Sequence, residues 1–202
     1  MHRIGPVVGL VVVVALVAGS ARGADGFRRH VVPGEGISLA VPATWVATDQ
    51  GVSPAVVERL ARENPKLAPF LRGLGGPSSP IRFFALDPNV RDGFATNVNV
   101  VVVPVSAAMT FAQYRQALVA ELRSAVASRI DQAVVSISGA RALRLRYHLR
   151  LTFGRTITVQ TLQYAFLRPG QSVVVTFTAL PRFASAYAGT FRRSAASIRF
   201  DS

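Results

Sequence analysis

Side chains that could perform catalysis are scarce in this sequence. Its 202 residues include no Cys and three His, of which only His30 and His148 lie beyond the N-terminal segment. A catalytic Ser needs an activating base beside it, and the nucleophile-elbow pattern Gly-x-Ser-x-Gly is absent. The sequence therefore assigns no catalytic residue, and an enzyme such as a hydrolase with an unrecognised site is kept only as an alternative.

Residues that could bind a metal or a cofactor are equally scarce. No His or acidic pair has the spacing of a zinc site. The segment DPNVRDG at 87–93 resembles the start of a calcium loop, but Arg91 stands where an oxygen ligand belongs and Gly93 comes one residue late. We expect instead a turn in which Asp87 accepts hydrogen bonds from local backbone N–H groups. The sequence predicts no metal and no cofactor.

The one pattern with binding chemistry is a row of cations in the final third of the chain. Apolar side chains alternate there with basic ones, which is typical of a half-buried strand. Same-face residues of a strand lie about 7 Å apart, so these cations repel one another. The apolar members are Leu143, Leu145, Tyr147, Leu149 and Leu151, and the basic members, here called the arginine strip, are Arg144, Arg146, His148 and Arg150.

Two interpretations of the arginine strip follow. It is either a solvated sheet face whose Arg stems cover apolar surface, or a surface that meets acidic neighbours or binds anions. The partner is not identified by the sequence; the candidates are an anionic envelope surface or another envelope protein. Nucleic acid is the least expected partner, because no aromatic platform alternates with the cations.

The strip must be positioned by neighbouring strands. Turn residues at 153–155 and 168–171 separate the alternating segment from two further β-rich runs, 156–166 and 172–180. Short turns of this kind join antiparallel strands. We therefore expect three antiparallel strands in the final third.

The remaining elements complete an α+β pattern. Strands are expected over 37–41, 81–86 and 97–105. A capping box at 110–113 begins a helix to about residue 127. Further helices are expected to begin at Ser53-Pro54 and at Pro181, because a capping Ser or Pro suits the first helical turn. Proline and glycine break the segment 64–80 into turns, Trp45 is expected to pack over one end of the core, and a last short strand is expected at 197–200.

The N-terminus has the pattern of a secretory signal. A basic start at Met1–Arg3 precedes an apolar run, and small residues at Ala21 and Gly23 suit cleavage before Ala24. We expect residues 1–23 to be a signal peptide and 24–202 to be a single domain with a net charge of 21 − 10 = +11. The alternative is an uncleaved membrane anchor, since residues 4–21 carry no charge. Lipid attachment at a processed N-terminus would need a Cys.

Three short segments resemble the PsbP-like and DcrB-like superfamily of small α+β proteins, whose bacterial members are often exported or lipid-anchored. They are ISLAVPATW at 37–45, TFTA at 176–179 and SAASIRF at 194–200, in the same order and spanning most of the chain after the signal. The resemblance implies a central antiparallel β-sheet flanked by helices. It implies no activity or shared site, because the superfamily has none in common.

The sequence thus predicts an α+β protein with a central antiparallel β-sheet flanked by helices, forming a single domain after the N-terminal signal segment. The predicted function is an exported, non-enzymatic accessory or binding protein of the cell envelope or the secreted fraction. The specific role cannot be read from the residues. A pocket with convergent polar groups would favour the enzyme alternative, and flat faces would favour a binding module.

Overall fold

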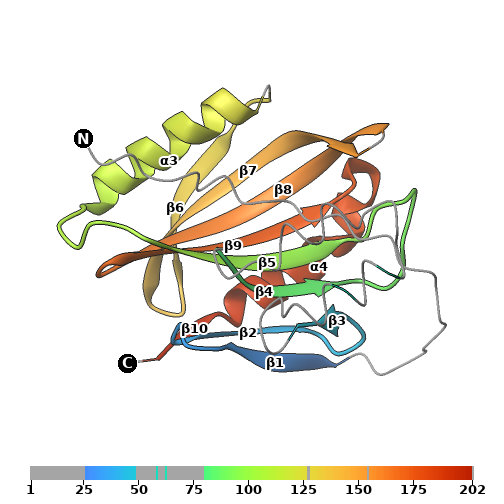
Figure 1. Cartoon of the computed structure of the whole chain (residues 1–202), viewed down its shortest axis with the longest axis horizontal. Helices are drawn as coiled ribbons and strands as arrows, with labels where there is room; N and C mark the ends of the chain where they lie inside the picture. Colours follow the sequence, from blue (N-terminus) through green and yellow to red (C-terminus); the bar gives the residue numbers. More distant parts are fainter. Residues whose placement is uncertain are drawn as a thin grey trace.

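A seven-stranded antiparallel sheet forms the centre of the protein (Figure 1). The computed structural model describes residues 26–48, 58, 62, 80–126, 128–153 and 155–201. In spatial order the strands are β3 (Val46–Ala47), β4 (Ile81–Leu86), β5 (Asn97–Pro104), β9 (Gln171–Ala179), β8 (Arg155–Arg168), β7 (Ala140–Phe153) and β6 (Asp131–Ile137).

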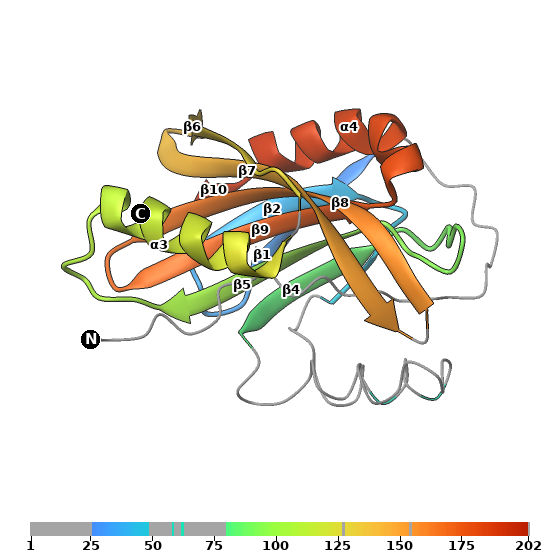
Figure 2. The ribbon, with the colours of Figure 1, turned by 90° about the horizontal axis from the view of Figure 1, so that it is seen from above.

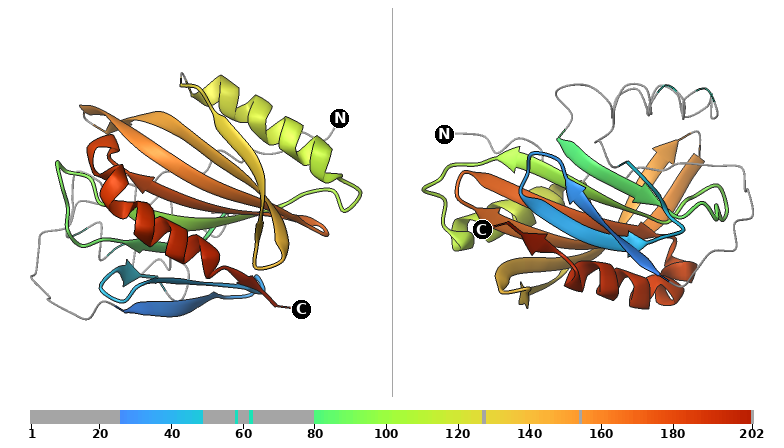
Figure 3. Two further views of the ribbon diagram at one scale, coloured as in Figure 1. Left: turned by 180° about the vertical axis from the view of Figure 1, so that it is seen from behind. Right: turned by 90° about the horizontal axis from the view of Figure 1, so that it is seen from below.

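A second, smaller sheet lies beside it. Its strands are β1 (Phe27–Val32), β2 (Ile37–Pro42) and β10 (Arg199–Phe200), with β2 in the middle. Strand β10 pairs with β2 in antiparallel register, which brings the C-terminal segment against the beginning of the described chain (Figure 3). The Ser197 hydroxyl strengthens this junction by accepting a 2.6 Å hydrogen bond from the Ala40 backbone N–H.

Two helices cover opposite faces of the large sheet (Figure 2). Helix α3 (Phe111–Ala125) packs Tyr114, Leu118 and Leu122 into one hydrophobic cluster. Helix α4 (Pro181–Ala196) and the small sheet form the second cluster on the other face, where Phe191 stacks near Phe177. Because strand side chains alternate between faces, the central strand β5 is buried on both sides.

The α+β class and the central antiparallel sheet flanked by helices are confirmed. The expected strands at 37–41, 81–86 and 97–105 correspond to β2, β4 and β5. The capping box forms as predicted, because the Thr110 side chain accepts from the Gln113 N–H and the Gln113 side chain accepts from the Thr110 N–H. Trp45 is buried at the edge of the α4 cluster and meets Tyr187 edge to face.

Two predictions about strands were incomplete. The final third contains four antiparallel strands, because residues 131–137 form β6, which pairs with β7 through a tight turn at Ser138-Gly139. The short strand expected at 197–200 corresponds to β10, but β10 pairs with β2 in a separate small sheet, and this second sheet was not expected. The predicted signal peptide at 1–23, the helix start at Ser53-Pro54 and the turns over 64–79 lie outside the described residues. In the described ranges, no helix combines the length and apolar character needed to cross a bilayer.

Candidate functional site

The arginine strip lies on β7, on the sheet face that also carries α4. Arg146, His148 and Arg150 are exposed, and Arg144 is half-buried. The alternating apolar residues of β7 point to the other face, where Leu143, Leu145 and Tyr147 are buried in the α3 cluster. The sequence therefore placed the two faces of this strand correctly.

Neutral residues of β8 face the arginine strip. The cross-strand partners of Arg144, Arg146, His148 and Arg150 are respectively Tyr164, Leu162, Gln160 and Thr158. On the other side of β7, Asp131 of β6 is the register partner of Arg146. It is the one acidic residue paired with the strip, and the ion pairs of the described residues do not include it.

The charges of the arginine strip affect the pKa of Tyr164. Its ring is buried, and burial raises the pKa of its hydroxyl above the ordinary value of 10.0. The nearby charges of Arg144 and Arg146 act in the opposite direction, because cations stabilise a phenolate. The two guanidinium groups thus act against the larger effect of burial, which raises the pKa of Tyr164 overall.

Helix α4 and Arg146 of the strip border a pocket of about 430 Å³, here called the α4 pocket. Arg146 projects from β7 and Arg192 from the last part of α4, so two guanidinium groups from separate elements line the same space. Gln160 and Ser185 add an amide and a hydroxyl. The apolar part of the lining consists of Leu162, Pro181, Ala184, Ala188 and Phe191.

The lining of the α4 pocket is suited to holding an anion. Guanidinium groups donate several hydrogen bonds in a planar fork and remain protonated, which makes them the preferred side chains for carboxylate and phosphate. The described lining residues include no Asp or Glu to compete. Among these described residues Ser185 is the one that could act as a nucleophile, and none of them is a His, Lys or acid that could activate it.

Sequence reasoning missed Arg192, although a signal for it exists. Residues 132–200 contain ten Arg and one His but no Asp or Glu. This acid-free stretch forms β7, β8, β9 and α4, so its cations gather on neighbouring elements. Of the predicted strip only Arg146 lines the α4 pocket; Arg144, His148 and Arg150 extend away from it along β7.

His30 and His148 lie on different strands, β1 and β7, and the contacts around them are those of structural residues. The backbone N–H of His148 donates to Ser128 Oγ and its carbonyl oxygen accepts from the same hydroxyl, at 2.9 and 3.0 Å. His30 is buried in β1 with its ring 5.4 Å from that of Phe83. Across the described ranges, no group of three or more His, Cys, Asp or Glu side chains could hold a metal ion.

The predicted Asp87 turn is confirmed. Asp87 Oδ1 accepts from the backbone N–H and the side-chain Nδ2 of Asn89, both at 2.8 Å. Its second oxygen accepts a 2.6 Å hydrogen bond from the Tyr187 hydroxyl of α4. Both carboxylate oxygens thus have structural partners.

Comparison with known proteins identifies the fold. No family model matches the chain, and no curated protein matches it in sequence. The structure of cyanobacterial PsbP (CyanoP) from Synechocystis sp. PCC 6803 superposes with a TM-score of 0.54 and 14% identity, covering 92% of this chain and 98% of that one. The fold is PsbP-like.

A second structure extends the likeness to a protein involved in cell envelope biogenesis. LpqN of Mycobacterium tuberculosis, described as involved in cell envelope biogenesis, gives a TM-score of 0.55 at 12% identity and covers 88% of this chain and 93% of its own. The expected PsbP-like and DcrB-like architecture is therefore confirmed. At such identities the likeness establishes the fold, while function must be argued from the residues of this chain.

Proposed function

We propose that this protein is an exported, non-enzymatic binding protein of the cell envelope, whose α4 pocket and arginine strip bind an anionic group of that envelope. The observation that carries the proposal is that Arg146 and Arg192 line one pocket whose described residues include no carboxylate. Lipid phosphates and acidic wall polymers have the matching chemistry.

Two observations support export: the N-terminal pattern of residues 1–23, and the described role of a protein with a similar fold. A basic start, an apolar run and small residues before Ala24 are typical of a secretory signal. LpqN, with a similar fold, is described as involved in cell envelope biogenesis. A binding role is favoured over hydrolysis because the described residues of the α4 pocket offer cations but no general base.

The test is co-sedimentation of the exported protein with vesicles of phosphatidylcholine alone or mixed with phosphatidylglycerol, at low and high salt. We expect binding to the anionic vesicles at low salt only. At about 1 kcal/mol for each cation near an anionic surface, the Arg146→Gln/Arg192→Gln variant should bind roughly 30-fold more weakly.

A charge-matched control separates the site from net charge. Arg115→Gln/Arg123→Gln removes two exposed cations from α3, on the opposite face of the sheet. It should retain most of the binding. Equal losses in both variants would mean that only total charge matters, and equal binding by wild type and the Arg146→Gln/Arg192→Gln variant would refute the proposed site.

A further inference from the structure

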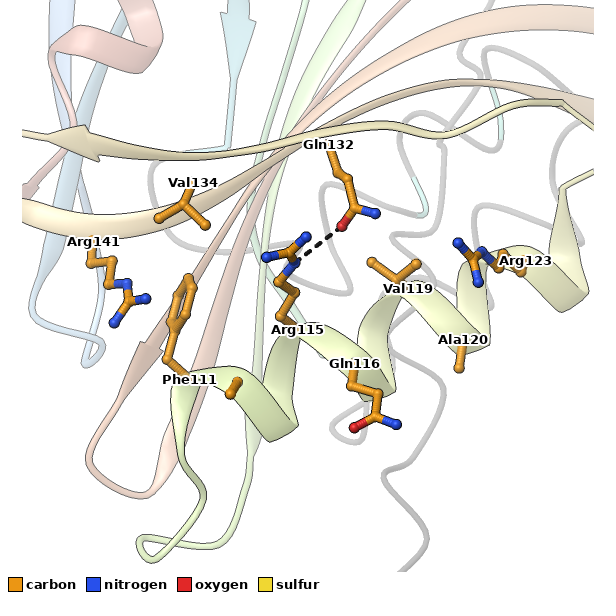
Figure 4. A pocket seen from close by; sticks show the side chains of 10 residues that line it. Phe111, Arg115, Gln116, Val119, Ala120, Arg123, Gln132, Val134 and Arg141 are labelled. Atoms are coloured by element: carbon orange, nitrogen blue, oxygen red, sulfur yellow. Dashed lines mark hydrogen bonds between the residues drawn. The ribbon is translucent and has the colours of Figure 1, made fainter.

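A second cationic hollow lies on the other side of the molecule, between helix α3 and strand β6 (Figure 4). Its volume is about 480 Å³, and we call it the α3 groove. The outer flank of α3 forms one wall, because residues four apart lie above one another on a helix. The groove is lined by Phe111, Ala112, Arg115, Gln116, Val119, Ala120, Arg123, Gln132, Val134 and Arg141.

Three guanidinium groups line the α3 groove. Arg115 reaches across it, and its Nε donates a 3.1 Å hydrogen bond to Gln132 Oε1 of β6 (Figure 4). Arg141, at the beginning of β7, lies with its guanidinium carbon 4.2 Å from the centre of the Phe111 ring. Arg123 stands in the last turn of α3. The nearest acids in sequence, Glu121 and Asp131, do not line the groove.

Strand β6 borders this groove and is the last strand of the large sheet. It pairs only with β7, and within the described part of the chain no backbone hydrogen bond reaches its other side from a turn or loop. Edge strands are commonly protected by Lys, Pro or a bulge. The sequence of β6, DQAVVSI, carries neither Lys nor Pro, and its register with β7 is unbroken.

Apolar surface is exposed at the same place. Val134, in the middle of β6, has a relative exposure of 45% and faces the groove beside Phe111 and Val119. An open strand edge, an apolar floor and three cations therefore occur together. Backbone pairing to an exposed edge gives affinity, and pockets for alternate side chains give specificity.

We propose that the α3 groove is a docking site for an extended, acidic segment of a partner protein, which pairs with β6 as an additional strand. Every second side chain of such a segment points toward α3, where acidic groups meet Arg115, Arg123 and Arg141. This inference does not depend on the α4 pocket, which lies on the opposite face of the sheet and takes a different ligand.

The test uses a synthetic peptide with Glu at every second position and Thr or Val between, and the full exported chain. A first control peptide carries Lys in place of Glu, and a second carries N-methyl groups on alternate residues, which remove the N–H donors needed for strand pairing. Binding is measured by calorimetry, and backbone protection at 131–137 by hydrogen exchange.

We expect the acidic peptide alone to bind and to slow hydrogen exchange in β6. The Arg115→Gln/Arg123→Gln/Arg141→Gln variant should bind it about tenfold more weakly, since each exposed ion pair contributes little. The Arg146→Gln/Arg192→Gln variant should bind it as wild type does. Thermal melts of both variants check that they are folded.

Several results would overturn the inference. No binding of the acidic peptide at millimolar concentration would reject the site, and undiminished binding by the triple variant would reject the role of the three Arg. Equal binding of the N-methylated peptide would reject strand pairing. If anionic vesicles, rather than the peptide, require these three Arg, the groove is a lipid-binding surface instead.

Discussion

The Tyr187 hydroxyl donates a 2.6 Å hydrogen bond to Asp87 Oδ2 and so ties helix α4 to the turn that follows strand β4. Asp87 is buried, and its other oxygen is held by Asn89. A hydrogen bond to a buried charged group contributes more than a neutral one, about 1.5–3 kcal/mol. This bond therefore helps to fix α4, the helix that supplies Arg192 to the α4 pocket.

Replacing Tyr187 with Phe should lower the free energy of unfolding by about 1.5–3 kcal/mol, because one carboxylate oxygen loses its donor. Denaturant titration of wild type and variant measures the difference. Tyr187 also contacts the rings of Trp45 and Phe191, and Phe keeps most of this packing. A change below about 0.5 kcal/mol would show that water replaces the hydroxyl without loss.

The free energy of unfolding should also fall at alkaline pH, because Tyr187 ionises there. Burial, and then the hydrogen bond and charge of Asp87, raise the pKa of Tyr187 from 10.0 to about 12. Between pH 10 and 12 the unfolded chain therefore binds fewer protons at this position than the folded chain, so the free energy of unfolding decreases as pH rises. The contribution is fully present below pH 10.

The Tyr187→Phe variant should show a shallower alkaline loss of stability, measured by denaturant titration at a series of pH values. It should not abolish the loss, because burial also raises the pKa of Tyr114 to about 12 and that of Tyr147 well above its ordinary range. Identical slopes in wild type and variant would contradict the prediction.

The core beneath α3 offers a test of packing. Leu122 is fully buried against the large sheet in the α3 cluster. Replacing it with Ala should lower the free energy of unfolding by about 2–5 kcal/mol, since the change removes apolar contacts and leaves a cavity. The matched control is Gln116→Ala on the exposed flank of the same helix, which should change stability by less than about 0.5 kcal/mol.

The sequence predicted most strongly those elements whose pattern is local. Alternation in β7 and the capping box of α3 involve residues close together in the chain, so they could be identified without knowledge of their partners. Strand β6 was missed because Val134 lies on the same face as Gln132 and Ser136, which interrupts the alternation. The small sheet was missed because, although strands were expected at 37–41 and 197–200, their pairing joins distant parts of the chain and no local pattern contains it.

The candidate site was predictable only in part, for the same reason. The spacing of the arginine strip placed four cations on one face of β7, and the structure does so. The meeting of Arg146 with Arg192 depends on how α4 crosses β8, which no local pattern contains. The absence of acids between residues 132 and 200 was the available signal, because no Asp or Glu of that stretch can neutralise the Arg residues of β7 and α4 where these two elements meet.

The turn between β6 and β7 should be sensitive to substitution. Ser138 and Gly139 both have left-handed backbone, with φ of 51° and 83°, as a two-residue type I′ hairpin requires. Gly139→Ala should lower the free energy of unfolding by about 1 kcal/mol from backbone strain alone, since a Cβ there meets nothing within 4 Å. Ser138→Asn should be close to neutral, because Asn adopts this conformation readily but the change removes the hydroxyl that donates to the Ala196 carbonyl and accepts from Arg199. Thermal melts of both variants against wild type measure the difference, and equal melting temperatures for Gly139→Ala and wild type would contradict it.

Cleavage of the N-terminal segment is the remaining prediction, and it decides whether the domain is released from the membrane or stays attached to it. Signal peptidase accepts small residues at the positions that Ala21 and Gly23 occupy, so the mature chain should begin at Ala24. N-terminal sequencing and intact mass of the exported protein check this directly. As a matched test, Ala21→Arg should block processing, because a large charged side chain does not fit the small-residue site.

A full-length product in the membrane fraction of cells expressing the wild-type protein would instead support the uncleaved anchor. In that case the α4 pocket and the α3 groove would be held near the bilayer by residues 4–21, and vesicle binding by the isolated domain would no longer be needed for localisation.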